Sequence, residues 1–386
     1  MNAAAPHTAP ILPPATLGML GGGQLGRFFV SAAHEMGYTV WVLDPDPESP
    51  AGRIADRHLC APYTDEATLD ELAAACAAVS TEFENVPAEA LEKLAERTLV
   101  RPGARAVAVC QDRIEEKTFV QGIGLAPAPF APLRNAADWR AMEESGVNLF
   151  PGILKAARLG YDGKGQAAVE DEAAARIAWS AMGQVPCVLE QRLSLDCEIS
   201  VILARAADGA TQVFPVAENQ HRNGILDISI VPARIGEKLR RQARDAAACI
   251  AGALEYVGTL AVEFFVSDGK LYVNEMAPRP HNSGHYTLDA CNVSQYEQQV
   301  RALAGLPLAR VRSHCASVMV NLLGECWLDG GLDWTTLYAA PDVCVHDYGK
   351  RTPRRGRKMA HFTVLGENVE AVYSRALAVR KKVVVL

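Results

Sequence analysis

The feature that most constrains the fold of this chain is a compact strand, helix and strand pattern near the N-terminus, with a glycine-rich turn inside it. Thr16–Gly21 is a short apolar strand, Arg27–Met36 has helical spacing, Gly37 ends that helix, and Tyr38–Leu43 is rich in β-branched and aromatic residues. Strand and helix patterns keep alternating as far as Arg97. Such alternation predicts a parallel sheet with helices on both faces, which is a Rossmann-like domain.

The glycine turn has the pattern Gly21-x-Gly23-x-x-Gly26, and Asp44 ends the next strand. Backbone N–H groups at the start of such a helix receive a phosphate in dinucleotide-binding proteins. The same glycines also occur in turns that only allow close helix–strand packing, and another phosphorylated ligand is a third interpretation. Prolines on both sides of Asp46 keep the chain extended, and no later segment resembles a hydride-transfer site, so NAD is disfavoured.

Length and composition limit the class of function. A chain of 386 residues is expected to form two or three domains, and its net charge of −7 does not favour a nucleic-acid partner. No apolar run is long enough to span a bilayer, and the N-terminus lacks the basic start of a signal peptide. The ten cysteines include no C-x-x-C pair, which argues against a zinc ribbon and favours reduced thiols in a cytoplasmic protein.

A second glycine-rich segment, Gly160–Gln166, lies between two strand-like segments. The N–H groups of such a loop can close over phosphates. Lys155 just before the loop and Lys164 inside it suit nucleotide phosphates, because ammonium groups offset the charge of the transferring oxygens. The spacing is not that of a Walker A motif. The alternative interpretation is a solvated hairpin turn.

Two glutamates lie in a predicted hairpin. Glu263 is embedded in the apolar strand Leu260–Val266, where an unpaired charge is costly, and Glu275 lies in the partner strand Leu271–Met276, across the turn Ser267–Lys270. A three-residue loop places the two glutamates on the same face of the hairpin, whereas a two-residue loop places them on opposite faces. On one face they repel each other unless a cation bridges them, and paired carboxylates with phosphate oxygens commonly hold Mg²⁺. Surface salt bridges on an exposed sheet face are the alternative.

The order and spacing of these motifs resemble the ATP-grasp superfamily. The finer pattern resembles the N5-carboxyaminoimidazole ribonucleotide synthetase (PurK) family over residues 16–365, in the segments Gly21–Gly26, Glu82–Val86, Gly160–Gln166, Glu218–Ile225 and Asn274–His285. The resemblance implies an α/β and α+β ATP-grasp fold. It divides the chain into a Rossmann-like domain at 1–112, an ATP-grasp domain at 113–310 with a lid at about 120–192, and a small C-terminal domain at 311–386.

The resemblance also implies an activity, which is the ATP- and bicarbonate-dependent carboxylation of 5-aminoimidazole ribonucleotide in purine biosynthesis. ATP would phosphorylate bicarbonate to carboxyphosphate, and the amine of the ribonucleotide would capture its carbon or the CO₂ released from it. The expected partners are therefore these three small molecules, with Mg²⁺ as cofactor and with neither nucleic acid nor membrane. The resemblance further suggests a cytoplasmic homodimer.

Site residues are carried over from the resemblance in three groups. ATP contacts are expected at Arg113, Lys117, Lys155, Gly160, Tyr161, Asp162, Gly163, Lys164, Gly165, Gln166, Glu190, Gln191, Glu198, His221, Asn274 and Glu275, and Mg²⁺ ligands at Glu263 and Glu275. Ribonucleotide contacts are expected at Gly23, Gln24, Leu25, Glu82, His281, Asn282, Ser283, Lys350 and Arg357, and catalytic roles at Lys155, Arg279 and Glu82. Many ATP-grasp enzymes carry Asn two residues after the second glutamate; Ala277 stands there in this chain, which leaves a third protein ligand open.

The segment Lys350–Lys358 carries six positive charges in nine residues. A solvated loop, a nucleic-acid site and a site for the 5′-phosphate of a ribonucleotide are the three interpretations. The nucleic-acid site lacks interleaved aromatic residues, and the family resemblance favours the phosphate site, with Arg279 as a further candidate. His281 and His285 have the spacing of a helical metal pair, but Gly284 and nearby prolines argue against a helix there.

Three other functions stay open at this point. A formate-dependent glycinamide ribonucleotide transformylase would share the ATP-grasp fold, but the segment Asn274–His285 disfavours it. An NAD-dependent dehydrogenase would rest on Gly21–Gly26 alone. A non-catalytic binding protein on the same fold is disfavoured because Lys155, Glu263 and Glu275 are retained.

Overall fold

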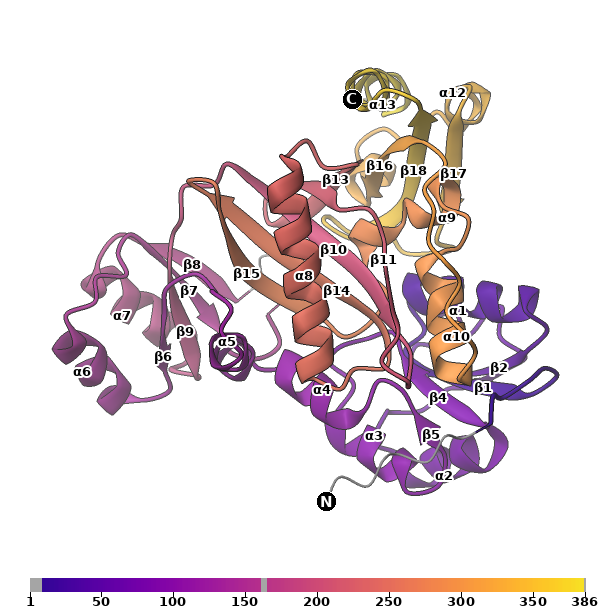
Figure 1. The fold of residues 1–386 in the computed structure, drawn as a ribbon, viewed down its shortest axis with the longest axis horizontal. Helices are drawn as coiled ribbons and strands as arrows, with labels where there is room; N and C mark the ends of the chain where they lie inside the picture. Colours follow the sequence, from indigo (N-terminus) through magenta and orange to yellow (C-terminus); the bar gives the residue numbers. More distant parts are fainter. Residues whose placement is uncertain (1–8, 161–164, 385–386) are drawn as a thin grey trace.

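The computed structural model of the chain describes residues 9–160 and 165–384, and this part contains three β-sheets (Figure 1). No described helix is long and apolar enough to cross a membrane. The predicted residues Tyr161, Asp162, Gly163 and Lys164 lie outside the described part of the chain.

The first sheet is parallel, as the sequence predicts, and its strand order is β3-β2-β1-β4-β5. Its strands are β1 (Thr16–Leu20), β2 (Thr39–Leu43), β3 (Arg57–Leu59), β4 (Ala78–Thr81) and β5 (Leu99–Val100). The helices of this region are α1 (Gln24–Glu35), α2 (Glu66–Ala75), α3 (Ala88–Ala95) and α4 (Ala104–Cys110). Helix α1 begins at Gln24 rather than at Arg27 because Gly23 is its N-cap residue, and Gly37 follows it with a φ of 84°.

The first sheet shares its core with a helix from much later in the chain. Leu17 and Met19 of β1 belong to the same buried cluster as Tyr296, Val300 and Leu303. These last three residues lie on α10 (Gln295–Ala304), which Figure 1 shows beside α1. Burial of this apolar surface fixes the N-terminal sheet against the segment that follows the acidic hairpin.

The second sheet is small and antiparallel, with the order β6-β9-β7-β8, and it projects from one side of the molecule (Figure 1). Its strands are β6 (Phe130–Leu133), β7 (Gly152–Ala156), β8 (Gln166–Val169) and β9 (Cys187–Gln191). The helices of this region are α5 (Arg113–Gly122), α6 (Ala136–Ser145) and α7 (Glu172–Ala181). Trp139 of α6 is fully buried and, with Leu154, anchors the core between the helices and the sheet.

The third sheet has nine strands, in the order β15-β14-β10-β12-β13-β16-β18-β17, with β11 paired to β10. The strands are β10 (Cys197–Arg205), β11 (Thr211–Val213), β12 (Ala217–Arg222), β13 (Ile225–Val231), β14 (Gly258–Ser267), β15 (Lys270–Ala277), β16 (Ala316–Leu323), β17 (Val343–Asp347) and β18 (Lys358–Gly366). The remaining helices are α8 (Glu237–Ala253), α9 (Thr287–Ala290), α11 (Glu325–Leu328), α12 (Trp334–Ala339) and α13 (Val369–Val383), with a 3₁₀ turn at Asn282–Gly284. The C-terminal strands therefore continue the sheet that contains the acidic hairpin.

Candidate active site

The acidic hairpin places its two glutamates directly opposite each other, for a reason that the sequence did not reveal. Ser267 pairs with Lys270, so the loop has two residues, Asp268 and Gly269, both with positive φ. With regular pairing a two-residue loop would put Glu263 and Glu275 on opposite faces. The register shifts beside Glu263, where Asn274 is the extra residue of a β-bulge, and Glu263 then pairs with Glu275.

Glu263 is buried, whereas the side chain of Glu275 is 40% exposed, and both lie among other charged groups. Burial and repulsion from Glu275 raise the pKa of Glu263 above its ordinary value. Burial also acts to raise the pKa of Glu275, but the charges of Arg113 and Lys155 outweigh it and hold that pKa below its ordinary value. The side-chain oxygen of Asn274 is buried and has no hydrogen-bond partner among the described residues. These oxygen donors fit a hard divalent cation such as Mg²⁺.

Two lysines bind one buried carboxylate beside the hairpin. Lys155 of β7 lies 3.0 Å from Oε1 of Glu190, and Lys117 of α5 lies 3.2 Å from Oε2 of the same residue. The side chains of Lys117 and Glu190 are only 1% and 2% exposed. Burial lowers the pKa of Lys155, although Glu190 opposes this shift, while burial acts to raise the pKa of Glu190 and the two lysines lower it. Because two ammonium groups share one carboxylate, this group has a net positive charge. Such a charge favours binding of a polyphosphate.

Arg113 links this cationic group to the hairpin and to the glycine loop. Its Nη1 lies 3.2 Å from Oε2 of Glu275, and its Nη2 donates to the carbonyl of Gly160 at 3.1 Å. The backbone N–H of Arg113 donates to Ala157, which follows β7. One guanidinium therefore holds the start of the predicted phosphate loop against the acidic pair.

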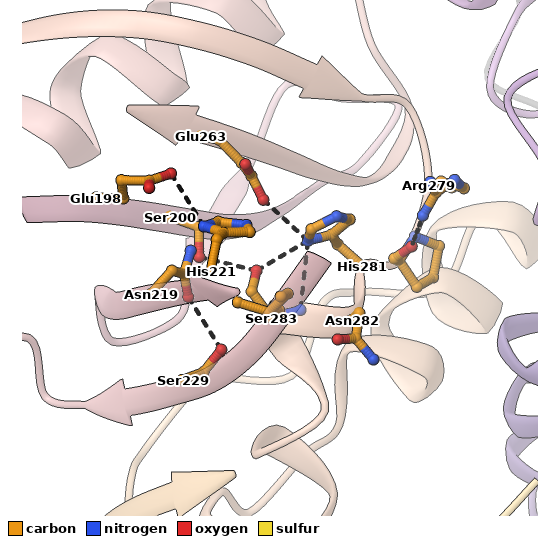
Figure 2. Close-up of polar contacts among 12 residues, drawn as sticks. Glu198, Ser200, Asn219, His221, Ser229, Glu263, Arg279, His281, Asn282 and Ser283 are labelled. Carbon is orange, nitrogen blue, oxygen red and sulfur yellow. Dashed lines mark hydrogen bonds and ion pairs between the residues drawn. The ribbon is translucent and has the colours of Figure 1, made fainter. Parts of the chain in front are cut away.

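A histidine and a glutamate from neighbouring strands extend the acidic group (Figure 2). Nδ1 of His221 on β12 lies 3.0 Å from Oε2 of Glu198 on β10. Burial acts to lower the pKa of His221, but the hydrogen bond to Glu198 and the charge of Glu263 raise it to about 9. His221 is thus a cation at neutral pH, and it offsets part of the negative charge of the glutamates.

The segment after the hairpin forms a second polar group on the other side of Glu263 (Figure 2). Nδ1 of His281 lies 3.7 Å from Oε1 of Glu263 and 2.9 Å from Oγ of Ser283, which accepts a 2.8 Å hydrogen bond from Ser200. Asn282 pairs its side-chain amide with that of Asn321, with hydrogen bonds in both directions. As expected, residues 282–284 form a 3₁₀ turn rather than a helix that could make His281 and His285 a metal pair.

The first glycine turn is occupied by carboxylates of the protein itself. Glu82 accepts hydrogen bonds from the backbone N–H groups of Gly23 at 2.5 Å and Gly26 at 3.1 Å, and Asp44 accepts one from Gly22 at 2.6 Å. A Cβ atom built on Gly23 would lie 2.7 Å from Glu82 Oε1, so the close approach requires glycine. In this structure the N–H groups of Gly22, Gly23 and Gly26 are therefore engaged by carboxylates of the protein itself, and phosphate binding at this turn stays a prediction.

Arg279 joins the first domain to the end of the hairpin. Its Nε donates to Oε2 of Glu84 at 2.5 Å. Burial acts to lower the pKa of Arg279, but the negative charges of Glu84, Glu82 and Glu275 raise it above its ordinary value. The predicted catalytic residues Glu82 and Arg279 thus lie in one charged network, together with Glu84. Lys155 belongs to the separate group around Glu190.

The basic segment is partly paired within the protein. Lys350 donates to the carbonyl of Lys358 at 2.7 Å, Arg357 donates to the carbonyl of Thr352 at 2.7 Å, and Arg351 forms an ion pair with Glu48 at 2.6 Å. Arg53 in turn donates to the carbonyl of Gly349. These contacts place the basic segment beside the loop that follows β2, on the side of the molecule that carries the first glycine turn.

Comparison with known proteins agrees with this architecture. A ribonucleotide synthetase preATP-grasp domain model matches residues 14–111, an ATP-grasp domain model matches 118–296, and a phosphoribosylaminoimidazole carboxylase C-terminal domain model matches 317–375. The N5-carboxyaminoimidazole ribonucleotide synthase of Brucella melitensis is 43% identical over 361 residues, which cover 91% of this chain and 96% of that protein. This chain belongs to the N5-carboxyaminoimidazole ribonucleotide synthase family.

Solved structures of this synthase family have the same fold. N5-carboxyaminoimidazole synthetase from Staphylococcus aureus, complexed with ADP, has a TM-score of 0.90 and 36% identity, and the match covers 98% of this chain and 100% of that one. The Aspergillus clavatus enzyme, in complex with ADP and 5-aminoimidazole ribonucleotide, has a TM-score of 0.84 and 26% identity, covering 95% and 98%. The resemblance inferred from the sequence motifs is confirmed, and the chain is an ATP-grasp ligase.

Sequence reasoning about this synthase missed three residues of the site, of which Glu116 and Ser200 are buried. Glu84 lies in a motif that carried the resemblance, but its partner Arg279 lies 195 residues away. Glu116 accepts a 2.5 Å hydrogen bond from the backbone of Met276, and burial and repulsion from Glu275 raise its pKa to about 8. Ser200 is fully buried. Glu116 could have been found from the sequence, because it is a charged residue on the apolar side of α5. The sequence around Ser200 carries no such signal.

Proposed function

We propose that this chain carboxylates 5-aminoimidazole ribonucleotide to N5-carboxyaminoimidazole ribonucleotide, with ATP and bicarbonate as co-substrates. A bicarbonate oxygen attacks the γ-phosphorus of ATP, ADP leaves and carboxyphosphate forms. The exocyclic amine of the ribonucleotide then attacks the carboxyl carbon, in carboxyphosphate or in CO₂ released from it. Phosphate is the second leaving group, and the amine loses a proton.

The observation that carries the proposal is the double contact of Arg113 with Glu275 and Gly160. It joins a pair of facing carboxylates, a lysine pair and a glycine-rich loop in one place. Phosphoryl transfer needs these three parts, because charge must be offset on the phosphate oxygens while water is kept away from a labile intermediate.

On the ATP side, Lys117, Lys155 and Arg113 bind the phosphates, and Glu190 fixes the positions of both lysines. The loop Gly160–Gln166 closes over the phosphates. Contacts of Glu190, Gln191, Glu198 and His221 with the nucleotide stay predictions. Glu263, Glu275 and the side-chain oxygen of Asn274 would hold Mg²⁺, which when bound supplies positive charge at the phosphate oxygens.

On the ribonucleotide side, we place the acceptor between the first glycine turn, the residues His281, Asn282 and Ser283, and the basic segment with Lys350 and Arg357. Arg279 and Glu82 supply charge there, and Glu84 fixes Arg279 through their 2.5 Å contact. The boundaries at residues 112 and 310, the homodimer and the cytoplasmic location likewise stay predictions.

ADP release with Mg·ATP and bicarbonate, with and without 5-aminoimidazole ribonucleotide, tests the proposal. We expect strong stimulation by the ribonucleotide and incorporation of labelled bicarbonate into an acid-labile product. A parallel assay with glycinamide ribonucleotide and formate tests the related transformylase. Stimulation by that pair alone would overturn the acceptor assignment, and ATP turnover that ignores both acceptors would overturn the proposal itself.

A further inference from the structure

A second group of metal-type side chains lies on elements that the proposed reaction does not use. It consists of Asp289 on α9, His346 on β17 and His361 on β18. One ligand atom from each of the three lies within 4.8 Å of the other two. His346 and His361 are direct cross-strand partners, so both rings stand on the same face of the sheet.

The ring of His361 is fixed by its neighbours, and one of its two nitrogens makes no hydrogen bond within the described part of the chain. The residue is fully buried, and its Nδ1 lies 2.9 Å from the Tyr348 hydroxyl. The ring of His285 stacks on it at 4.6 Å. Nε2 of His361 is buried and has no hydrogen-bond partner in the described part of the chain. Buried polar groups are normally satisfied, so an unpaired imidazole nitrogen points to a missing ligand.

The two other residues of this group are Asp289, which supplies a carboxylate, and His346, which supplies an imidazole ring that can turn. Nε2 of His346 lies 2.9 Å and 3.1 Å from the two carboxylate oxygens of Asp289. The rings of His346 and His361 stack at 4.6 Å, so one of them must turn before both nitrogens can face a single ion. The His346 side chain is 24% exposed, whereas His361 is fixed on two sides, so His346 is the ring that can turn.

We propose that Asp289, His346 and His361 bind one divalent transition-metal ion of the Zn²⁺ type, which ties α9 to strands β17 and β18. Two imidazoles and a carboxylate are a common ligand set for zinc, with water in the fourth position. Tyr348 has the position of an outer partner, because it can accept the Nδ1–H bond that orients His361 towards a metal at Nε2. The ion is structural and independent of the Mg²⁺ that the carboxylation uses.

Cobalt(II) titration of the full chain, after chelation and in excess Mg²⁺, tests the proposal. Excess Mg²⁺ competes with cobalt for the acidic hairpin, and cobalt bound by thiolates is recognised by sulfur charge-transfer bands, which nitrogen and oxygen ligands do not give. We expect one cobalt ion per chain without those bands, displaced by Zn²⁺. His346→Asn and Asp289→Asn should each weaken binding by at least about tenfold.

The matched control is His34→Asn, because His34 on α1 and Asp56, just before β3, form a 2.9 Å histidine–carboxylate pair. This variant should bind cobalt like the wild type. Zn²⁺ should raise the Tm of the wild type and of His34→Asn, but not that of His346→Asn. Equal cobalt binding by the wild type and His346→Asn, or sulfur charge-transfer bands on the bound ion, would overturn the proposal whatever the ATP assay shows.

Discussion

Glu263 and Glu275 are direct cross-strand neighbours on β14 and β15, although the turn between these strands has only two residues. The bulge at Asn274 turns both carboxylates to one face. Placing two like charges side by side, with Glu263 buried, costs stability until a cation lies between them. Such an arrangement points to a bound cation, and bulges are over-represented next to active sites.

Glu275→Gln tests the acidic pair, because it removes the charge but keeps the volume. We expect ADP release to fall by roughly 100-fold or more, since the variant would lose a ligand of the Mg²⁺ that offsets the phosphate charge. Glu237→Gln on α8 is the control, because that carboxylate is 75% exposed and forms its ion pair with the nearby Arg240. Circular dichroism checks the fold of both variants. Turnover within about threefold of the wild type would contradict the Mg²⁺ assignment.

Local patterns were sufficient to predict the hairpin and most elements of the first domain, but not the short strands β3 and β5 or the helix α4. The β-branched runs, the glycine turn and the Asp268-Gly269 turn are signals that depend on neighbouring residues only. The bulge at Asn274 had no such signal, because it depends on how two strands pair. The number of residues in the turn therefore does not predict the face on which each glutamate lies once one strand contains a bulge.

Long-range contacts explain the rest of what the sequence did not predict. Glu82 reaches Gly23 across 59 residues, and its carboxylate occupies N–H groups that a local pattern assigns to a ligand. Lys155 was singled out by its place before the glycine loop, and Lys117 and Glu190 through the family resemblance, but their shared contact arises only when α5, β7 and β9 come together. The extension of the central sheet by β16, β17 and β18 likewise depends on pairing between strands that are far apart in the sequence.

Glu190→Gln tests the lysine pair, because it leaves Lys117 and Lys155 buried without a counter-charge. Breaking a buried ion pair by removing one partner costs about 3–5 kcal/mol, and we expect a loss of this size in urea unfolding. Bound Mg·ATP should recover part of it, since the phosphates supply negative charge. Glu66→Gln, which removes the partner of Lys93 on the surface, is the control and should leave the unfolding midpoint unchanged. A loss that nucleotide does not reduce would contradict phosphate binding by the lysines.

The thiols should divide into reactive and protected sets. Cys60 and Cys249 are exposed, whereas burial raises the pKa of Cys76 to about 12. Because the thiolate is the reactive form, the buried thiol stays protonated and inert at pH 8. Brief alkylation followed by mass spectrometry should label Cys60 and Cys249 first, and only urea should expose Cys76. Labelling of Cys76 at the rate of Cys60 in the native protein would contradict the packing around β4.

Lys350→Ala tests the ribonucleotide side. If Lys350 contacts the 5′-phosphate, losing this charged hydrogen bond should raise the KM for the ribonucleotide by about 10-fold or more. The KM for ATP should stay close to that of the wild type, because we place the ATP phosphates at Lys117 and Lys155, away from this segment. Arg355→Ala is the matched control, since it removes a positive charge from the same segment, where Arg355 pairs with Asp329 at 2.6 Å. An equal rise of both KM values in Lys350→Ala, or an equal effect in Arg355→Ala, would assign the basic segment a general electrostatic role instead of a specific phosphate contact.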